Sequence, residues 1–395
     1  MDKPIKLLQL NTVAQNGAIA DFMSQITLEA ETRGWNVVTA FGRGKSPDGK
    51  SAFKIGSSFT TIGHALRSRL GDAEGLGSIN ANLRLADRIA AINPDILHLH
   101  NLHGYYLNYP ILFSFLREWG KPVFWSLHDC WAFTGHCASF STPAGECLKW
   151  MHNCERCAFA RTYPKSYVDC SKRNFNLKKN ILTSLPNVTL LPVSKWLSDR
   201  LESSFLKDLP KEVVSIDVDT NVFRPCEAKT EKLILGVANR WNPQKGLRFF
   251  ENLRKEIPAD VNISLIGQKP NNKVPGINYL GPIVDKEQLS QLYSQATVFV
   301  NPSYAETYSM TNREALASGA YVVSRDAGGV SEFLDDLPIK IAKTDNELVE
   351  QVLLALDNPK IVTPGFAWDT HREMEQIYGD KPGLKRLFKL YESAL

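Results

Sequence analysis

Hydrophobic and polar residues alternate along the chain in blocks that predict strands and helices in turn. The run Ile5 to Asn11 is apolar and predicts a buried first strand, residues 19–34 have helical spacing, and Asn36 to Ala40 predicts the next strand. A strand, a loop, a helix and a second strand in this order are typical of a doubly wound α/β domain with a parallel sheet.

The alternation of predicted strands and helices continues along the chain, and one polar stretch interrupts it. Further strands are predicted in the first half at residues 95–100, 122–127, 187–193 and 213–218. Residues 224–232 are polar, as a linker between domains would be, and strands are predicted again at 233–238, 262–267 and 277–281. A chain of 395 residues, 43 % of them hydrophobic, is large enough for two domains with separate cores.

Residues 297–324 predict a strand, a loop, a helix that begins at about Tyr308, and another strand. Ser309, Met310 and Thr311 stand at the start of that helix. Backbone N–H groups at a helix N-terminus lack helical partners and, with the helix dipole, favour an anion such as a phosphate. The stretch therefore predicts a phosphate-binding loop.

Two acids bracket this loop. Glu314 lies inside the predicted helix, where its carboxylate could accept hydrogen bonds from the hydroxyls of a ribose beside the phosphate. Glu306 precedes the helix and could face a sugar. The alternative is an ordinary βαβ unit with two solvated acids.

Two basic residues flank the loop after the strand at 233–238. Arg240 and Lys245 stand at the carboxyl end of that strand, where two fixed cations can neutralise a departing diphosphate. A solvated loop with two scattered cations is the alternative.

In the first half, His128 and Asp129 end the strand predicted at 122–127, and Gly17 lies in the loop after the first strand. Ligands of doubly wound folds bind at the carboxyl ends of strands, so all three are candidates. A His–Asp pair that only shapes its turn and a glycine in a plain turn are the alternatives.

Period-2 histidines in the strand at 95–100 suggest a second candidate. His98 and His100 point the same way on a strand, and His103 follows, so a metal site is geometrically allowed. We favour histidines at the edge of a cleft, because no acid or cysteine of fitting spacing completes a metal site.

Four cysteines follow, with intervals of nine, six and two residues: Cys137, Cys147, Cys154 and Cys157. A structural zinc ion held by four thiolates, free thiols and disulfides are the three options. The intervals are not those of a standard zinc ribbon.

Charge and hydropathy exclude several classes of protein. Residues 1–220 carry 25 Lys+Arg against 20 Asp+Glu, and residues 221–395 carry 21 against 22, so the excess of cations lies in the first half. This bias is far from the basic stripe of a nucleic-acid binder and suits a weak attraction to an anionic membrane or substrate. With no apolar run long enough to span a bilayer and no signal-peptide pattern, we expect a cytoplasmic protein, with peripheral contact to the inner membrane as an option.

Three motifs resemble those of one family. The spacing E-x7-E between Glu306 and Glu314, after Asn-Pro-Ser and before Glu-Ala-Leu-Ala-Ser-Gly, resembles the signature of retaining GT-B glycosyltransferases of family 4. HDxWxFTG at 128–135 is similar to a segment of the bacterial exopolysaccharide, O-antigen and colanic-acid transferases of that family, and GxxNRxxxxKG at 236–246 to its diphosphate-binding loop. Ser309 stands where the family usually has glycine.

The resemblance implies an α/β fold of GT-B type, with two Rossmann-like domains facing a central cleft and a C-terminal helix that crosses back to the first domain. The implied domains are an acceptor-side domain at 1–224, with a cysteine-containing insertion at about 134–165, a nucleotide-sugar domain at 225–368, and returning helices at 369–395.

The resemblance also implies a hexosyltransferase-type enzyme that moves a sugar from a UDP- or GDP-sugar to a hydroxyl of a lipid-linked glycan, in bacterial lipopolysaccharide or exopolysaccharide synthesis. No cofactor is required in that family. A GT-B epimerase or hydrolase and a non-catalytic nucleotide-sugar-binding subunit are the alternatives.

The family's residue roles fall on positions of both halves. Arg240 and Lys245 would grip the diphosphate, and Glu306 would orient the donor sugar. His128 would lie near that sugar, with Asp129 in a supporting or acceptor-side role. The remaining binding positions would be Gly17 at the donor phosphate and acceptor, Gly281 and Ile283 near the nucleobase, Ser309, Met310 and Thr311 at the phosphate, and Glu314 at the ribose.

Overall fold

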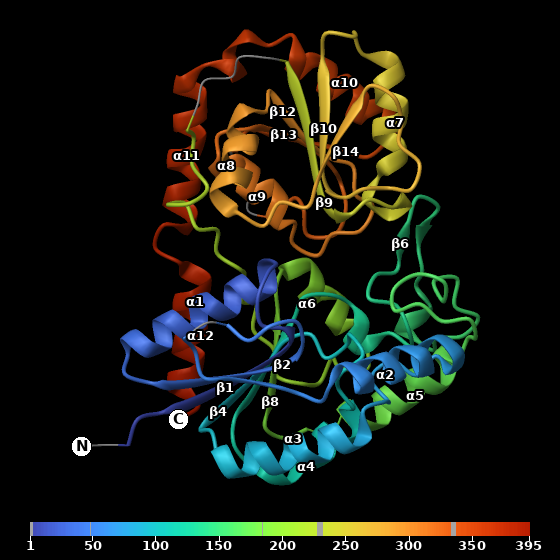
Figure 1. Cartoon of the computed structure of the whole chain (residues 1–395), viewed down its shortest axis with the longest axis vertical. Helices are drawn as coiled ribbons and strands as arrows, with labels where there is room; N and C mark the ends of the chain where they lie inside the picture. The colour runs from blue at the N-terminus through green and yellow to red at the C-terminus, as the bar shows by residue number, and fades with distance from the viewer. Residues whose placement is uncertain (1–2, 48, 184, 227–231, 333–336) are drawn as a thin grey trace. The chain divides into compact units, whose positions relative to one another are not determined.

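The structure is a computed structural model that describes residues 3–47, 49–183, 185–226, 232–332 and 337–395. The chain divides into two compact units (Figure 1). Unit 1 comprises residues 1–140, 146–215 and 384–395, and unit 2 comprises residues 141–145 and 216–383.

Unit 1 is built on a parallel sheet of six strands. Their order across the sheet is β3-β2-β1-β4-β5-β8, and every pairing is parallel. Their bounds are β1 (Lys6–Val13), β2 (Asn36–Arg43), β3 (Ala52–Lys54), β4 (Ile96–Leu99), β5 (Val123–Leu127) and β8 (Val188–Pro192). All residues of β4 and β5 are buried, because helices cover both faces of a parallel sheet.

The helices of unit 1 have local start signals. Ser57 forms a capping box with Thr60 at α2, and the side chains of Asn108 and Ser194 cap α4 and α6. Their bounds are α1 (Ala18–Thr32), α2 (Ser58–Gly71), α3 (Ile79–Ile92), α4 (Tyr109–Trp119), α5 (Ser171–Leu182), α6 (Lys195–Glu202) and α12 (Pro382–Ser393).

Helix α12 packs into the core of unit 1, although it ends the chain. The rings of Trp35 and Phe388 lie 5.3 Å apart, and the Tyr391 hydroxyl is hydrogen-bonded to His98 Nδ1 in the centre of the sheet. Short elements complete the first 215 residues: η1 (Trp131–Phe133), η2 (Lys149–Met151) and the two-stranded sheet of β6 (Ser141–Thr142) and β7 (Gly145–Glu146).

Unit 2 repeats the same topology. Its six parallel strands have the order β11-β10-β9-β12-β13-β14. Their bounds are β9 (Leu233–Arg240), β10 (Asn262–Gln268), β11 (Ile277–Gly281), β12 (Val298–Asn301), β13 (Tyr321–Arg325) and β14 (Ile339–Ala342). The helical elements are η3 (Pro243–Lys245), α7 (Leu247–Glu256), α8 (Lys286–Gln295), α9 (Met310–Ala317), α10 (Asp345–Leu356), η4 (Pro359–Val362) and α11 (Pro364–Tyr378).

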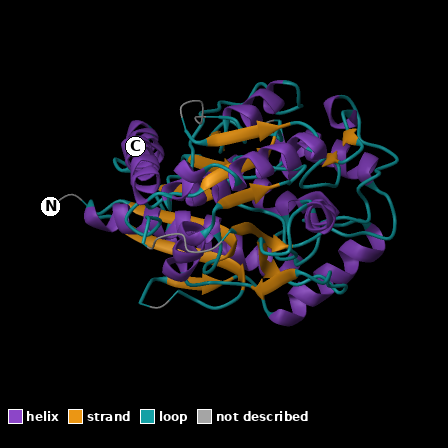
Figure 2. Ribbon diagram, turned by 90° about the horizontal axis from the view of Figure 1, so that it is seen from above, coloured by secondary structure: helices purple, strands orange, loops and turns teal. Residues whose placement is uncertain are grey.

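Alternating strand residues divide unit 2 into two cores, one on each face of the sheet. Val298 and Val300 of β12 join a cluster with α7 and α10, whereas Phe299 joins a cluster with α8, α9 and α11. Successive strand residues point to opposite faces, so an unbroken apolar strand supplies both cores. Figure 2 shows the strands, in orange, among the surrounding purple helices.

Both sheets confirm the doubly wound α/β prediction, and one strand prediction is wrong. Residues 213–218 form no regular strand: beside β8 there is an isolated bridge between Leu190 and Lys211, and pairing with β8 ends with the hydrogen bond from the Val214 N–H to the Pro192 carbonyl. The helices implied at 369–395 are α11, which begins earlier, at Pro364, and α12, and Gly379 and Pro382 stand at the break between them. Residues 227–231 of the predicted linker lie outside the described residues.

The strand order reverses at one point in each sheet, between β1 and β4 and between β9 and β12. Doubly wound folds bind ligands at the carboxyl ends of the strands at this switch point. The candidate residues of both units are therefore sought there. Among the described residues, no helix combines the length and apolar character that crossing a membrane requires.

Candidate functional site

An ion pair stands at the switch point of unit 2. Lys245, in η3 after β9, places its Nζ 2.7 Å from Glu306 Oε1, in the loop after β12. The Glu306 side chain is 15 % exposed and that of Lys245 35 % exposed, so the pair is partly shielded but open to a ligand. Two residues that are 61 positions apart thus meet where the fold binds ligands.

Two glycines hold the loops of this pair together. A Cβ on Gly328 would lie 1.6 Å from the carbonyl oxygen of Glu306, and one on Gly246 would lie 2.6 Å from Pro302. Both glycines have positive φ, 62° and 73°, which side chains rarely adopt. The backbone of Glu306 and the end of η3 are therefore fixed by close packing that only glycine permits.

Helix α9 begins directly after this loop, with Ser309 as its N-cap residue and Met310 and Thr311 as its first helical residues. Ser309 has φ 50° and ψ 74°, a left-handed conformation in which glycine would be unstrained. Its buried hydroxyl accepts a hydrogen bond from Asn301 Nδ2 at 2.9 Å instead of capping the helix. The first turn of α9 therefore has no side-chain cap, as an anion site requires.

Asn301 is a site residue that the sequence analysis missed. Its side chain also donates to Asn312 Oδ1 at 2.9 Å and accepts from the backbone N–H of Ser303 at 3.2 Å. One amide thus joins the end of β12, the loop and α9. The Asn-Pro-Ser sequence was noted, but the buried position of the asparagine depends on tertiary packing.

Glu314 lies one turn farther into α9, and Tyr293 of α8 donates a hydrogen bond to its Oε2 at 3.3 Å. Tyr293 is fully buried, so burial, together with the Glu314 carboxylate, raises its pKa well above the ordinary value. The hydroxyl stays protonated and can hold the Glu314 carboxylate in place.

Arg240 lies at the end of β9, where its Nε donates to Gln268 Oε1 at 2.9 Å and the side chain is exposed. Among the described residues, no ion pair of Arg240 is present.

Gly281 ends β11 with φ 86°, and Ile283 beyond it packs its side chain against the core with α8 and α9. Ile283 can thus offer a ligand mainly its backbone.

The switch point of unit 1 has a different chemistry, because its histidines are stacked and buried. The His98 and His100 rings lie 4.1 Å apart, and His100 Nδ1 lies 3.3 Å from His128 Nε2. Burial lowers the pKa of His98 to about 3 and that of His128 to about 4. These rings are neutral at pH 7, and His98 belongs to the core instead of to a cleft edge.

His103 and Asp129 form a second pair at this end of the sheet. His103 Nε2 lies 2.6 Å from Asp129 Oδ2, and His103 Nδ1 lies 2.8 Å from the Tyr163 hydroxyl. Burial would raise the pKa of Asp129, but His103 and the Trp131 N–H outweigh it and the pKa is lowered. Asp129 is thus a carboxylate, and the sequence analysis missed its link to His103 and Tyr163.

A buried lysine holds the backbone of the turn that follows His128 and Asp129. Lys178 Nζ donates to the carbonyls of Trp131 and Thr134 at 2.5 and 3.0 Å. Burial lowers the pKa of Lys178 to about 7.

Gly17 precedes α1 with φ 105°, and a Cβ built on it would have no heavy atom within 4 Å, so the space beside Gly17 is open.

The four cysteines of the insertion lie near one another as free thiols, and the zinc option stays a prediction. All seven cysteines are free thiols, and within the described residues no group of three or more His, Cys, Asp or Glu could hold a metal ion. Cys137 is hydrogen-bonded to Cys157, while Cys154 Sγ accepts the backbone N–H of Gly135 at 3.2 Å. Cys154 also interacts electrostatically with Cys157 and Cys147, and no disulfide is formed.

Comparisons with known proteins support one family. Residues 231–358 match the family of glycosyl transferases group 1. The chain is 22 % identical over 391 residues, covering 92 % of each protein, to the putative colanic acid biosynthesis glycosyl transferase WcaC of Escherichia coli.

Solved structures share the fold at low identity. Sucrose-phosphate synthase from Thermosynechococcus elongatus matches with a TM-score of 0.72 and 14 % identity, covering 98 % of both chains. HepE of Anabaena, in complex with UDP and glucose, matches with a TM-score of 0.68 and 12 % identity, covering 98 % of this chain and 100 % of its own. With a group 1 domain, a WcaC-like sequence over most of its length and the GT-B fold, the protein is a glycosyltransferase of the hexosyltransferase type.

Proposed function

We propose that the protein is a retaining glycosyltransferase that moves a sugar from a UDP- or GDP-sugar to a hydroxyl of a lipid-linked glycan, in the synthesis of a bacterial surface polysaccharide. The similarity to a colanic acid transferase supports the pathway class, and the complex of HepE with UDP and glucose supports a nucleotide sugar as donor.

The observation that carries the proposal is the Lys245–Glu306 pair beside the uncapped start of α9. A cation and helix amides favour a diphosphate, while a carboxylate next to them is unfavourable for phosphate alone. A ligand with both a diphosphate and a sugar satisfies both, since sugar hydroxyls can donate hydrogen bonds to Glu306 and the diphosphate can pair with Lys245.

In the proposed reaction, the bond between the anomeric carbon and the diphosphate oxygen breaks while the acceptor oxygen attacks the same face. The acceptor proton passes to the departing phosphate oxygen, so charge and atoms balance. Lys245, Arg240 and the amides of Met310 and Thr311 stabilise the negative charge that develops on the diphosphate.

The carboxylates and the histidine have positioning roles in this proposal. Glu306 orients the donor sugar, and Glu314, fixed by Tyr293, accepts hydrogen bonds from the ribose hydroxyls. His128 is neutral because of its lowered pKa, so its ring can form hydrogen bonds with sugar hydroxyls without adding a positive charge beside the sugar. Asp129 keeps its acceptor-side role, and Gly17, Gly281 and Ile283 remain predicted contacts of the phosphate, acceptor and base.

Ligand binding and turnover test the proposal in two steps. We expect one series among UDP, GDP, ADP and their sugars to raise Tm, since a ligand at about 100 times its Kd adds roughly 2.7 kcal/mol of stability. Donor consumption is then followed with and without a lipid-linked acceptor. Transfer that depends on the acceptor supports the proposal, whereas donor consumption without any acceptor identifies a hydrolase or epimerase and contradicts it.

A further inference from the structure

Helix α2 has its apolar residues on the outside. Its buried side chains are polar, His64 at 2 % and Ser68 at 1 % exposure, and the His64 ring accepts backbone N–H bonds from Gly75 and Gly77. A surface helix of a soluble domain normally buries its apolar stripe and exposes its polar one. In α2 the usual arrangement is inverted.

The exposed residues of α2 form a continuous stripe. Positions i, i+3, i+7 and i+11 lie on one face of a helix. Four large apolar side chains occupy these positions, with exposures of 87, 66, 55 and 61 %: Phe59, Ile62, Leu66 and Leu70. The start of α3 adds Ile79 at 48 % and Leu83 at 50 % exposure. Apolar residues gathered in this way mark an interaction surface, unlike scattered single ones.

Cations surround this stripe. Between residues 51 and 92 five basic side chains are exposed, Lys54, Arg67, Arg69, Arg84 and Arg88. Of the three acids in the same segment, Asp72 and Glu74 are buried, which leaves Asp87 as the exposed one among the described residues. The surface is therefore apolar and strongly basic at once.

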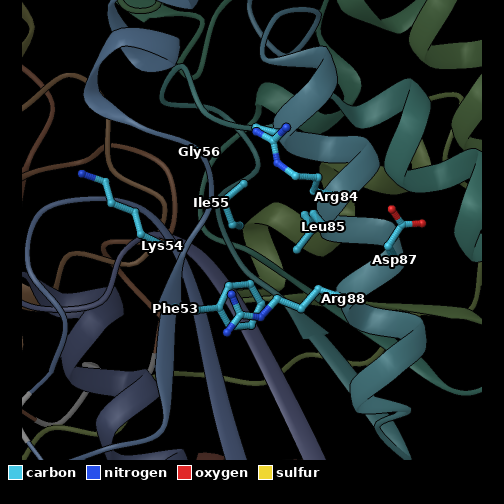
Figure 3. A pocket seen from close by; sticks show the side chains of 9 residues that line it. Phe53, Lys54, Ile55, Gly56, Arg84, Leu85, Asp87 and Arg88 are labelled. Carbon is cyan, nitrogen blue, oxygen red and sulfur yellow. The ribbon is translucent and has the colours of Figure 1, made fainter.

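A hollow of about 440 Å³ borders the start of α2 and concentrates part of this charge. Three basic residues and one acid, Lys54, Arg84, Arg88 and Asp87, line it together with Gly56, and α2 begins two residues after Gly56. Figure 3 shows Arg88 lying over the Phe53 ring, 3.7 Å from the ring centroid, while Asp87 points away from that ring. Arg84 and Lys54 form no ion pair within the described residues, so they are available to an anionic group.

We propose that the exposed faces of α2 and α3 form a docking surface for a bilayer of anionic phospholipids. The apolar stripe enters the boundary between headgroups and acyl chains, as amphipathic helices do, and the arginines pair with headgroup phosphates. The hollow beside Gly56 receives one such headgroup. Charge complementarity selects this occupant: a second copy of the chain would bring the same cations face to face.

The inference extends the proposed function, since a lipid-linked acceptor lies in a membrane. The surface belongs to unit 1, as do His103 and Asp129, while the candidate nucleotide-sugar residues Lys245 and Glu306 belong to unit 2. Vesicle binding without donor or acceptor can therefore be measured separately from transfer.

The test is co-flotation of the full chain with vesicles of phosphatidylcholine, with and without about one-third phosphatidylglycerol, at low and high salt. We expect binding to the anionic vesicles that weakens with salt. Replacing Phe59, Ile62 and Leu66 by serine should weaken it at least tenfold, because each buried apolar side chain contributes to partitioning. The matched control replaces exposed apolar residues elsewhere, Leu28, Val284 and Leu354, by serine and should bind normally.

A charge-reversal pair separates electrostatics from apolar contact. R67E with R84E should weaken binding roughly tenfold or more, since each basic residue near the surface contributes separately. K207E with K273E changes the net charge equally and should have little effect. Unchanged Tm in all variants shows that folding is intact.

Three results would overturn the proposal. One is no binding to anionic vesicles, and another is an equal loss in the control variants. The third is a concentration-dependent dimer that the serine variant abolishes, which would make this face a self-association surface. Any of these would leave the nucleotide-sugar site standing, whereas failure of donor binding would leave vesicle binding intact.

Discussion

The two sheets share one strand order, yet their switch points carry different chemistry. In unit 2 the residues after β9 and β12 are a charged pair, Lys245 and Glu306, in a partly exposed loop. In unit 1 the residues after β4 and β5 include His100 and His128, whose rings are kept neutral by burial. Topology therefore fixes where a site lies, while burial and the neighbours of each group decide its charge: burial keeps His128 neutral, whereas His103 keeps Asp129 ionised.

This difference suits different parts of a donor. Fixed charges stabilise a diphosphate whose charge increases as the sugar departs. Neutral histidine rings suit the uncharged hydroxyls of a sugar, because a charged imidazolium would attract anions that compete with the sugar. The following experiments test this contrast, in order of decreasing expected effect.

The largest effect should come from removing the charges of unit 2. Lys245→Met and Glu306→Gln should each lower kcat by roughly 10²–10³-fold, as the loss of one preorganised electrostatic group does. Because the two groups act as a pair, the kcat of the double variant should be no lower than that of the less active single variant. Lys273→Met and Glu287→Gln are charge-matched controls in the same unit, and multiplicative losses in the double variant would contradict a coupled pair.

A steric change should damage the same site without touching a charge. Gly328→Ala places a Cβ against the Glu306 carbonyl, so we expect a loss of about 1–3 kcal/mol in the free energy of unfolding and reduced transfer. Gly63→Ala, in α2 with no heavy atom within 4 Å of its Cβ, should instead stabilise by roughly 0.5–1 kcal/mol. Thermal unfolding of both variants measures the contrast, and equal effects would remove the packing argument.

The neutral histidines of unit 1 predict a stability that depends on pH. His98 and His128 have pKa values of about 3 and 4 in the folded chain, below the ordinary 6.5. Below pH 6.5 the unfolded chain therefore binds more protons than the folded chain. The free energy of unfolding falls as the pH drops from 6.5 towards 4, and each of the two histidines contributes up to about 1.4 kcal/mol per pH unit.

His98→Gln removes one of these groups, so its stability should fall less steeply between pH 6 and 4 than that of the parent. Urea unfolding at several pH values gives the slopes. His152→Gln, at an exposed histidine, is the control and should keep the parent slope. A parallel slope for His98→Gln would show that burial of this ring does not govern the acid response.

The smallest effect concerns the cysteines. We expect a strong chelator to leave Tm unchanged, since Cys137 is hydrogen-bonded to Cys157 and Cys154 accepts the Gly135 N–H, so these thiols have partners without a metal ion. Loss of a structural zinc ion would instead remove binding free energy on the order of 10 kcal/mol. Metal analysis of the purified protein, with a chelator titration, distinguishes the two.

Periodicity predicted most strands to within two or three residues, because strands buried on both faces are continuous apolar runs. The strand at 213–218 failed for the same reason: Val214 still bonds to β8, but the buried residues Ile216 and Val218 beyond it belong to no strand. A hydrophobic pattern reports burial and cannot distinguish burial within a strand from burial outside one.

The sequence by itself determined the two α/β units, the loops that carry candidate chemistry and, through the spacing of Glu306 and Glu314, a resemblance to one family. Tertiary structure alone decided which side chains meet: Lys245 with Glu306, Asn301 with Ser309, His103 with Asp129 and Tyr163. It also decided that His98 is neutral and that α2 exposes its apolar stripe. The reason is physical: contacts between distant residues and the desolvation of a group depend on how elements pack, which local sequence does not specify.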